Sequence, residues 1–142
     1  MLVNYSVEVK CGGRVAIQGE NIATPLINAV YKNVLQAGGH PIIMPRSMAT
    51  AEMLFRYGSR EQMAYVHEVQ RIIMEKYDVR IVILGGENSK ALSNVPSDKM
   101  AWHDLAYAEL MKTMMQRTAR GEFRWVIAPY PTASRFGHRT RN

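Results

Sequence analysis

The segment CGGRVAIQGENIATPLINAVYKNVLQAGGHPIIMP, residues 11–45, decides the fold of this chain. Residues 14–18 and 41–45 within it are short apolar runs of the kind found in buried strands. The residues between the two runs place apolar side chains at helical spacing: Leu26, Ile27, Val30, Val34 and Leu35. A strand, a helix and a strand in this order predict a right-handed crossover between two parallel strands.

The ends of this first helix also have a sequence signature. Thr24 is followed by Pro25, a pair that is typical of a helix start with a hydroxyl N-cap. Gly38 and Gly39 come directly after the last apolar position, where a helix commonly ends in a left-handed residue. The pattern therefore predicts a helix that is capped by Thr24, begins at Pro25 and ends before the glycine pair.

The rest of the chain repeats the alternation of strand and helix. Residues 79–84 (VRIVIL) and 123–128 (FRWVIA) predict two further strands, and helices are expected over about 49–57 and 97–118. We expect the long last helix to bury one face: Leu105, Ala108, Met111, Met115 and Ala119. The fold class is therefore α/β, with a mainly parallel sheet of about four or more strands and helices on both faces, Rossmann- or flavodoxin-like.

One more helix is predicted after Gly58. Ser59 and Gln62 have the spacing of a capping box, with the serine at the N-cap and the glutamine at the third helical position. The apolar residues that follow predict a single buried stripe: Met63, Val66, Val69, Ile73 and Met74.

Composition restricts the classes of function. The net charge is +6, and three of the basic residues lie in the last eight positions, leaving 15 basic against 12 acidic residues that alternate along the helices. This distribution argues against a nucleic-acid interface, which needs a continuous basic surface. No apolar run approaches the ~18 residues of a membrane span, and the start of the chain is not a secretory signal. With Cys11 as the single cysteine, we expect a cytoplasmic protein that binds no membrane.

The loops that follow the predicted strands are where ligands meet an open parallel sheet. The candidate residues for ligand or interdomain contact in these loops are Glu20, Glu87, Asn88, Tyr130 and Thr132. The loop GGENSK lacks the spacing of a phosphate-binding Walker motif, and no Gly-x-Ser-x-Gly or His-Glu-x-x-His motif is present. We therefore predict no catalytic residue, no metal ligand and no cofactor bound by this chain.

Three stretches of the sequence carry a family resemblance: NYSVEVKCGGRVAIQGENIATPLINAVYKNVLQAGGHPII, ENSKALSNV and GEFRWVIAPYPTAS. Their order and spacing resemble the amino-terminal part of the thermophilic aminopeptidases, the aminopeptidase T and aminopeptidase S family. The similarity extends over residues 1–134. Residues 135–142 form a basic stretch that departs from the family pattern, and we expect this tail to be disordered.

The resemblance implies a metal-dependent peptidase that removes amino-terminal residues from peptides. Members of the family have two domains, form dimers and hold two divalent metal ions in the carboxyl-terminal domain. The resemblance thus implies that residues 1–134 are the amino-terminal domain, inactive alone, with the absent catalytic domain and a second copy of the chain as its partners. Whether this shortening is natural, engineered or a frameshift stays open. The alternative is a self-contained flavodoxin-like module that binds a small ligand or a protein.

Overall fold

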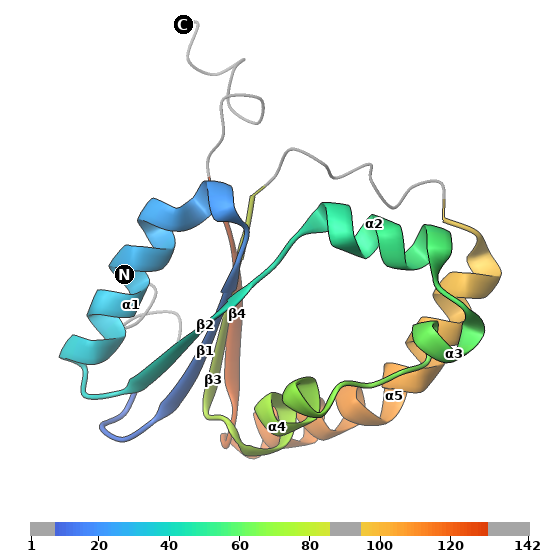
Figure 1. The fold of residues 1–142 in the computed structure, drawn as a ribbon. Helices are drawn as coiled ribbons and strands as arrows, with labels where there is room; N and C mark the ends of the chain where they lie inside the picture. The colour runs from blue at the N-terminus through green and yellow to red at the C-terminus, as the bar shows by residue number, and fades with distance from the viewer. Residues whose placement is uncertain (1–7, 86–94, 131–142) are drawn as a thin grey trace, which may run out of the picture.

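A computed structural model describes residues 8–85 and 95–130 of the chain (Figure 1). Four strands form one sheet in the order β2-β1-β3-β4, and every pair is parallel. The strands are β1 (Arg14–Gly19), β2 (His40–Pro45), β3 (Val79–Leu84) and β4 (Arg124–Pro129). All four strands predicted from the sequence are confirmed within one residue at each end. The predicted α/β class with a parallel sheet is confirmed as well.

Helices cover both faces of this sheet, as predicted. The helix α1 (Thr24–Gln36) lies on one face, and α2 to α5 lie on the other (Figure 1). The helices of the second group are α2 (Met48–Tyr57), α3 (Arg60–Met63), α4 (Glu68–Lys76) and α5 (Ser97–Ala119). A membrane-crossing helix would need more length and apolarity than any helix of the described residues offers.

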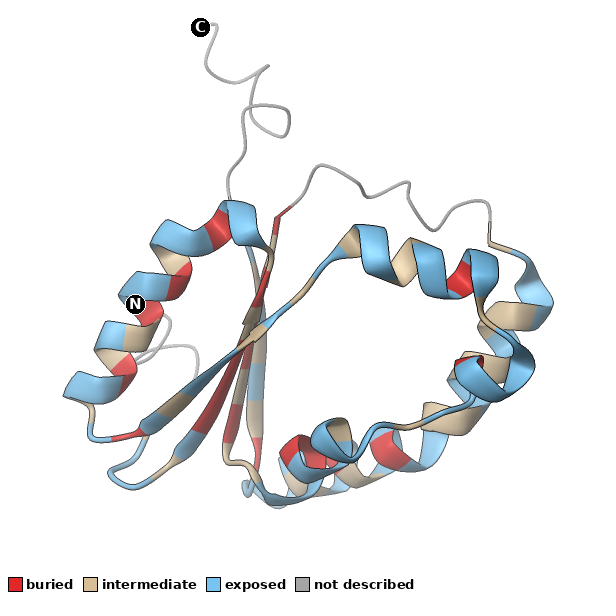
Figure 2. Cartoon of the chain, viewed as in Figure 1, coloured by how far each residue is buried: buried red, intermediate tan, exposed pale blue. Residues whose placement is uncertain are grey.

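The larger core lies between the sheet and α1. It joins apolar side chains of the two central strands to the inner face of the helix: Val15, Ile17, Val79, Ile81, Ile83, Ile27, Val30 and Val34. Figure 2 shows this concentration of buried positions on the central strands and on one side of α1. Gly38, with φ +85°, ends the helix as the sequence predicted, because a left-handed backbone costs glycine little.

The predicted role of Thr24 is wrong. A short 3₁₀ turn, η2 (Asn21–Ala23), precedes α1, and Thr24 is the first residue of α1 rather than its N-cap. Its hydroxyl donates a hydrogen bond to the carbonyl oxygen of Asn21 at 2.5 Å. The Thr24 side chain therefore bonds to the 3₁₀ turn and does not cap the N–H groups at the start of α1.

The second core lies within the helical layer and corrects the predicted face of α5. Leu110 and Met114 of α5 are buried against Met74 of α4 and Phe123. Leu105 and Met115, which were expected to be buried, are 76% and 58% exposed. The helix is apolar on more than one side, and α4 contacts a different side from the one that the spacing favoured.

The helix predicted after Gly58 is divided in two. Ser59 caps α3 with the predicted capping box: its backbone N–H donates to Gln62 Oε1 at 2.8 Å, and its hydroxyl accepts from the Gln62 N–H at 3.2 Å. The chain leaves the helix after Met63 and re-enters at α4, which exposes Val69. The predicted continuous stripe is therefore wrong, although Met63, Ile73 and Met74 are buried.

The outer edge of β2 is modified by prolines. The N–H groups of His40 and Arg46 donate to carbonyl oxygens of β1 or its entry turn, so the nitrogens of the odd-numbered residues 41–45 face away from β1. Pro41 and Pro45 occupy two of these three positions and supply no N–H. This placement explains why prolines are tolerated at both ends of this strand.

Candidate functional site

Glu20 lies at the carboxyl edge of the sheet, where the sequence predicted ligand contacts. Its carboxylate accepts a hydrogen bond from the backbone N–H of Gly85 at 2.7 Å. A Cβ at position 85 would come within 2.6 Å of Glu20 Oε2, so only glycine permits this approach. The contact ties the end of β1 to the end of β3 and uses one oxygen of the carboxylate that was predicted to contact a ligand or another domain.

Tyr130, at the same edge, also has a structural role. Its N–H donates to the carbonyl oxygen of Leu84 at 2.8 Å, which extends the pairing of β4 with β3. Its side chain is half-buried against the core beneath α1. The remaining predicted residues, Glu87, Asn88 and Thr132, lie outside the described residues.

The described residues do not fit a two-metal centre. His40 is on β2, His67 precedes α4, and His103 is on α5, so the three histidines lie on separate elements. Within residues 8–85 and 95–130, no three His, Cys, Asp or Glu side chains converge where they could hold a metal ion. A hydrolytic site with two divalent ions needs several such donors at one place.

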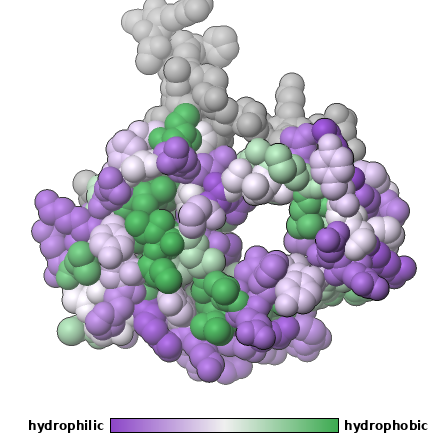
Figure 3. Space-filling model, viewed as in Figure 1, coloured by the Kyte–Doolittle hydropathy of each residue, from purple (hydrophilic) through white to green (hydrophobic). Residues whose placement is uncertain are grey.

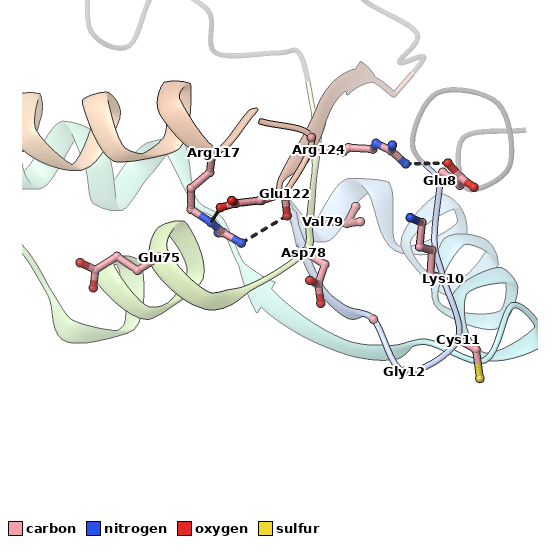
Figure 4. Close-up of a pocket in the computed structure, with 12 residues that line it drawn as sticks. Glu8, Lys10, Cys11, Gly12, Glu75, Asp78, Val79, Arg117, Glu122 and Arg124 are labelled. Carbon is pink, nitrogen blue, oxygen red and sulfur yellow. Dashed lines mark hydrogen bonds and ion pairs between the residues drawn. The ribbon is translucent and has the colours of Figure 1, made fainter. Parts of the chain in front are cut away.

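A charged groove of about 570 Å³ lies at the opposite, amino edge of the strands. Figure 4 shows Arg124 beside Glu8 and Arg117 beside Glu122, whereas Cys11 points away from these charges. The Arg124–Glu8 pair is 2.8 Å long and the Arg117–Glu122 pair is 3.7 Å long.

The charges of this groove join segments that are distant in sequence. Arg117 also donates to the carbonyl oxygen of Met74 at 2.9 Å and lies over the ring of Phe123. Asp78 accepts from the N–H of Arg14 at 2.8 Å, which links the starts of β3 and β1. These contacts use Arg117, Arg124, Asp78, Glu8 and Glu122 to hold the strand starts to one another and to neighbouring segments.

A second cavity, of about 380 Å³, lies between the sheet and the helical layer. Figure 3 shows the molecule hollowed between these two parts. The sheet contributes Gln18 of β1 and Arg80 of β3, and α4 and α5 contribute a largely apolar and aromatic wall. We call this space the interlayer cavity.

Hydrogen bonds hold polar side chains on two walls of the interlayer cavity. Arg80 Nε donates to Gln18 Oε1 at 2.6 Å. On the opposite wall, the Tyr107 hydroxyl donates to Gln70 Oε1 at 2.6 Å, and the Tyr107 ring stacks on His103 with 4.4 Å between ring centroids. Burial raises the pKa of Tyr107 above its ordinary value.

Arg80 is the arginine whose side chain lines the interlayer cavity. It forms no ion pair with a described residue, whereas Arg56, Arg117, Arg120 and Arg124 each form one. Burial, and secondarily the positive charge of Arg46, lower the pKa of Arg80. The sequence held a signal for this residue, because Arg80 is the charged position within the apolar run VRIVIL.

Comparison with known proteins gives a family and a fold. A family model described as thermophilic metalloprotease (M29) matches residues 1–135. Among solved structures, wild-type AmpT from Thermus thermophilus is similar, with a TM-score of 0.71 and 15% sequence identity. No curated protein matches the chain.

The extent of these matches decides what they establish. The structural similarity covers 92% of this chain and 34% of the AmpT chain, so this chain spans about a third of that protein's length. At 15% identity the similarity establishes the fold. The family model, in contrast, matches nearly the whole sequence, and this confirms the resemblance seen in the sequence. The chain belongs to the thermophilic metalloprotease family M29.

Proposed function

We propose that residues 1–134 form the amino-terminal, non-catalytic domain of a metal-dependent aminopeptidase and that this chain is inactive alone. The observation that carries the proposal is the combination of the two matches. The family model matches residues 1–135, whereas the chain corresponds to 34% of the length of AmpT. In this proposal the two divalent metal ions of the aminopeptidase are bound by a domain outside these residues.

The distribution of possible metal ligands supports this assignment. No three candidate donors come together in the described residues, and the two described loop candidates, Glu20 and Tyr130, hold the strand ends together. Activation of water by two metal ions would need such donors. The distribution of these side chains therefore supports the role of a structural domain for the described part of the chain.

The test is an activity assay of the purified chain. The chain is incubated with an amino-acid anilide and Co²⁺, Zn²⁺ or Mg²⁺, beside a full-length member of the family and a blank that contains metal alone. We expect the full-length enzyme to release the amine and the chain to match the blank. Turnover that rises in proportion to the concentration of this chain and disappears with a chelator would refute the proposal.

The proposal includes partners and a location. We infer that the chain associates with the catalytic domain and with a second copy of itself, in the cytoplasm. Trp125 and Ile127 of β4, which are 40% and 51% exposed, support an association surface on the helical side of the sheet. Sedimentation equilibrium should give a mass above that of one chain, and a monomer at all concentrations would contradict self-association.

The self-contained binding module remains the second candidate, and the interlayer cavity favours it. A hollow with an apolar wall and a few placed polar groups is the usual form of a small-ligand site. The two candidates differ in whether the chain works alone or as one domain of a larger enzyme. The activity assay tests the first candidate and a binding measurement tests the second.

A further inference from the structure

The guanidinium of Arg80 is half-buried without a counter-ion among the described residues. It projects from the second residue of β3 toward the helical layer, and its Nε is engaged by the neutral side-chain oxygen of Gln18. A charge that is withdrawn from water is usually paired, because desolvation costs free energy that a neutral acceptor offsets in part. The interlayer cavity thus presents a cation with unused donors.

Arg46 adds a second positive charge next to this cation. It follows β2, and its Nε is buried with no hydrogen-bond partner among the described residues. The two arginines repel each other, since the charge of Arg46 contributes to the lowered pKa of Arg80. An anion bound to Arg80 would offset part of this repulsion.

The carboxylate that the cavity itself contains does not meet this need. Asp104 of α5 lies on the wall, but its side chain is 71% exposed and its described partner is His103 Nδ1 at 3.5 Å. The residues around it give the wall its apolar character: Ile73, Met74, Tyr107, Leu110 and Met111. A bound anion would therefore need an apolar body that contacts α4 and α5.

We propose that the interlayer cavity binds a small organic carboxylate with an apolar side chain, its carboxylate on Arg80 and its apolar part against Leu110 and Met111. The volume of about 380 Å³ is within the usual range of small-ligand sites. Two sources share this chemistry: a free apolar amino acid and the carboxyl-terminal residue of a short peptide. The binding site is independent of the proposed aminopeptidase role and requires no catalytic step.

The first experiment is isothermal titration calorimetry of the whole chain with matched probes. N-acetyl-leucine carries the carboxylate and the apolar body, N-acetyl-leucinamide lacks the charge, and sulfate lacks the apolar body. We expect the acid to bind at least about 10-fold more tightly than the amide, because hydrogen bonds to charged groups are the stronger ones. Sulfate should bind more weakly than the acid. Equal binding of acid and amide, or no binding of the acid, overturns the proposal.

The second experiment compares two arginine variants that change the net charge equally. Arg80→Met removes the cavity cation, and Arg71→Met removes an exposed arginine of α4 outside the cavity lining. We expect Arg80→Met to weaken N-acetyl-leucine binding about 10- to 100-fold and Arg71→Met to leave it within about twofold. Similar dissociation constants for the two variants would show that Arg80 does not hold the carboxylate.

A third variant keeps the test decisive if Arg80→Met does not fold. Met111 is 47% exposed at the apolar wall, so Met111→Trp can fill the space without disturbing the buried core. We expect this variant to retain the wild-type circular dichroism spectrum and to lose binding of the acid. Unchanged binding contradicts the assigned position. Separate titrations with leucine and leucyl-leucine then show which of the two sources the cavity accepts more tightly.

Discussion

Glu20 shows how a loop carboxylate can be a structural residue. Its position after β1 is one where parallel sheets present ligand-binding side chains, yet its oxygen is bonded to the N–H of Gly85. The carboxylate oxygen satisfies the N–H of Gly85, a buried residue that directly follows β3. Its removal therefore leaves that donor without its partner, which costs more than the mean value of a hydrogen bond.

The first prediction concerns this residue. Glu20→Ala should lower the free energy of unfolding by about 1–3 kcal/mol, because the Gly85 N–H loses its acceptor. Glu109→Ala, which removes an exposed carboxylate from α5, should change it by less than about 0.5 kcal/mol. Urea denaturation followed by circular dichroism measures both. Equal effects would mean that the Glu20–Gly85 contact contributes nothing.

Arg80 marks the limit of residue-level prediction. A charge inside VRIVIL was visible, but a single strand does not reveal which face is covered or what lies opposite. The register places Gln18 on the same face of the neighbouring strand, and α4 and α5 form the far wall. These relations depend on tertiary packing, so the interlayer cavity could not be inferred from local sequence.

At the scale of the element, α5 illustrates why the existence of a helix is easier to predict than its buried face. The helix begins at Ser97, as predicted, and ends at Ala119, before Gly121 with φ +74°. Several stripes of α5 are apolar, and the methionines occupy two of them. The choice between them is made by the partner α4, whose own boundaries the sequence pattern misplaced.

Two neighbouring methionines of α5 give the second prediction. Met114 is 3% exposed and Met115 is 58% exposed. Met114→Ala should destabilise the fold by about 2–5 kcal/mol, because it leaves a cavity between α4 and α5. Met115→Ala should change stability by less than about 0.5 kcal/mol. Thermal and urea denaturation measure the stability of both variants. A larger loss for Met115→Ala than for Met114→Ala would mean that α5 buries the face expected from the spacing.

The third prediction concerns the tie between α5 and α4 made by Tyr107. Burial raises its pKa above the ordinary value of 10.0, so the folded chain keeps the phenol proton at a pH where the unfolded chain loses it. The contribution of Tyr107 to stability is therefore complete below pH 10.0 and declines as pH rises through the folded-state pKa.

Tyr107→Phe provides the matching control for this pH dependence. The difference in phenolate absorbance between wild type and variant should titrate with a midpoint above 10.0. The variant should also lose about 1 kcal/mol of stability at neutral pH, because the bond to Gln70 is removed. A difference titration centred at or below the ordinary value would show that the phenol is not shielded from water.

At the scale of the whole molecule, the two cores differ in size and in their connection to the sheet. The core under α1 includes both central strands, whereas the helical layer buries a smaller cluster and is separated from part of the sheet by the interlayer cavity. The α2 and α3 helices each bury one residue, Phe55 and Met63 respectively. We therefore expect local opening to cost more free energy in the core under α1 than in the helical layer.

The fourth prediction follows from this asymmetry. Amide hydrogens of β1, β3 and α1 should exchange the slowest, and those of α2 and α3 should exchange faster by at least about tenfold, through local opening. Hydrogen exchange read by mass spectrometry of peptides provides the comparison. Uniform protection across both groups would indicate that the molecule opens as a single cooperative unit.

The strands and the fold class could be predicted because central parallel strands are buried on both faces and read as continuous apolar runs. The run VRIVIL predicted the bounds of β3 without error, and the run PIIMP predicted β2 to within one residue. The division of α3 from α4 could not be predicted, since residues 64–67 have no glycine or proline to mark the break. That break is fixed by packing against α5.

The prolines of β2 have a consequence for polymerisation of the sheet. Pro41 and Pro45 leave Ile43 as the one outward N–H donor among residues 41–45, so this margin is a poor template for another strand. On β4, the N–H groups of Trp125 and Ile127 point outward, because the alternate positions donate to β3. A fibril that grows by strand addition needs two sheet edges that can accept a new strand in every copy. Pairing through β4 would therefore stop at two copies, with their β4 edges joined and the proline-containing β2 edge of each copy on the outside.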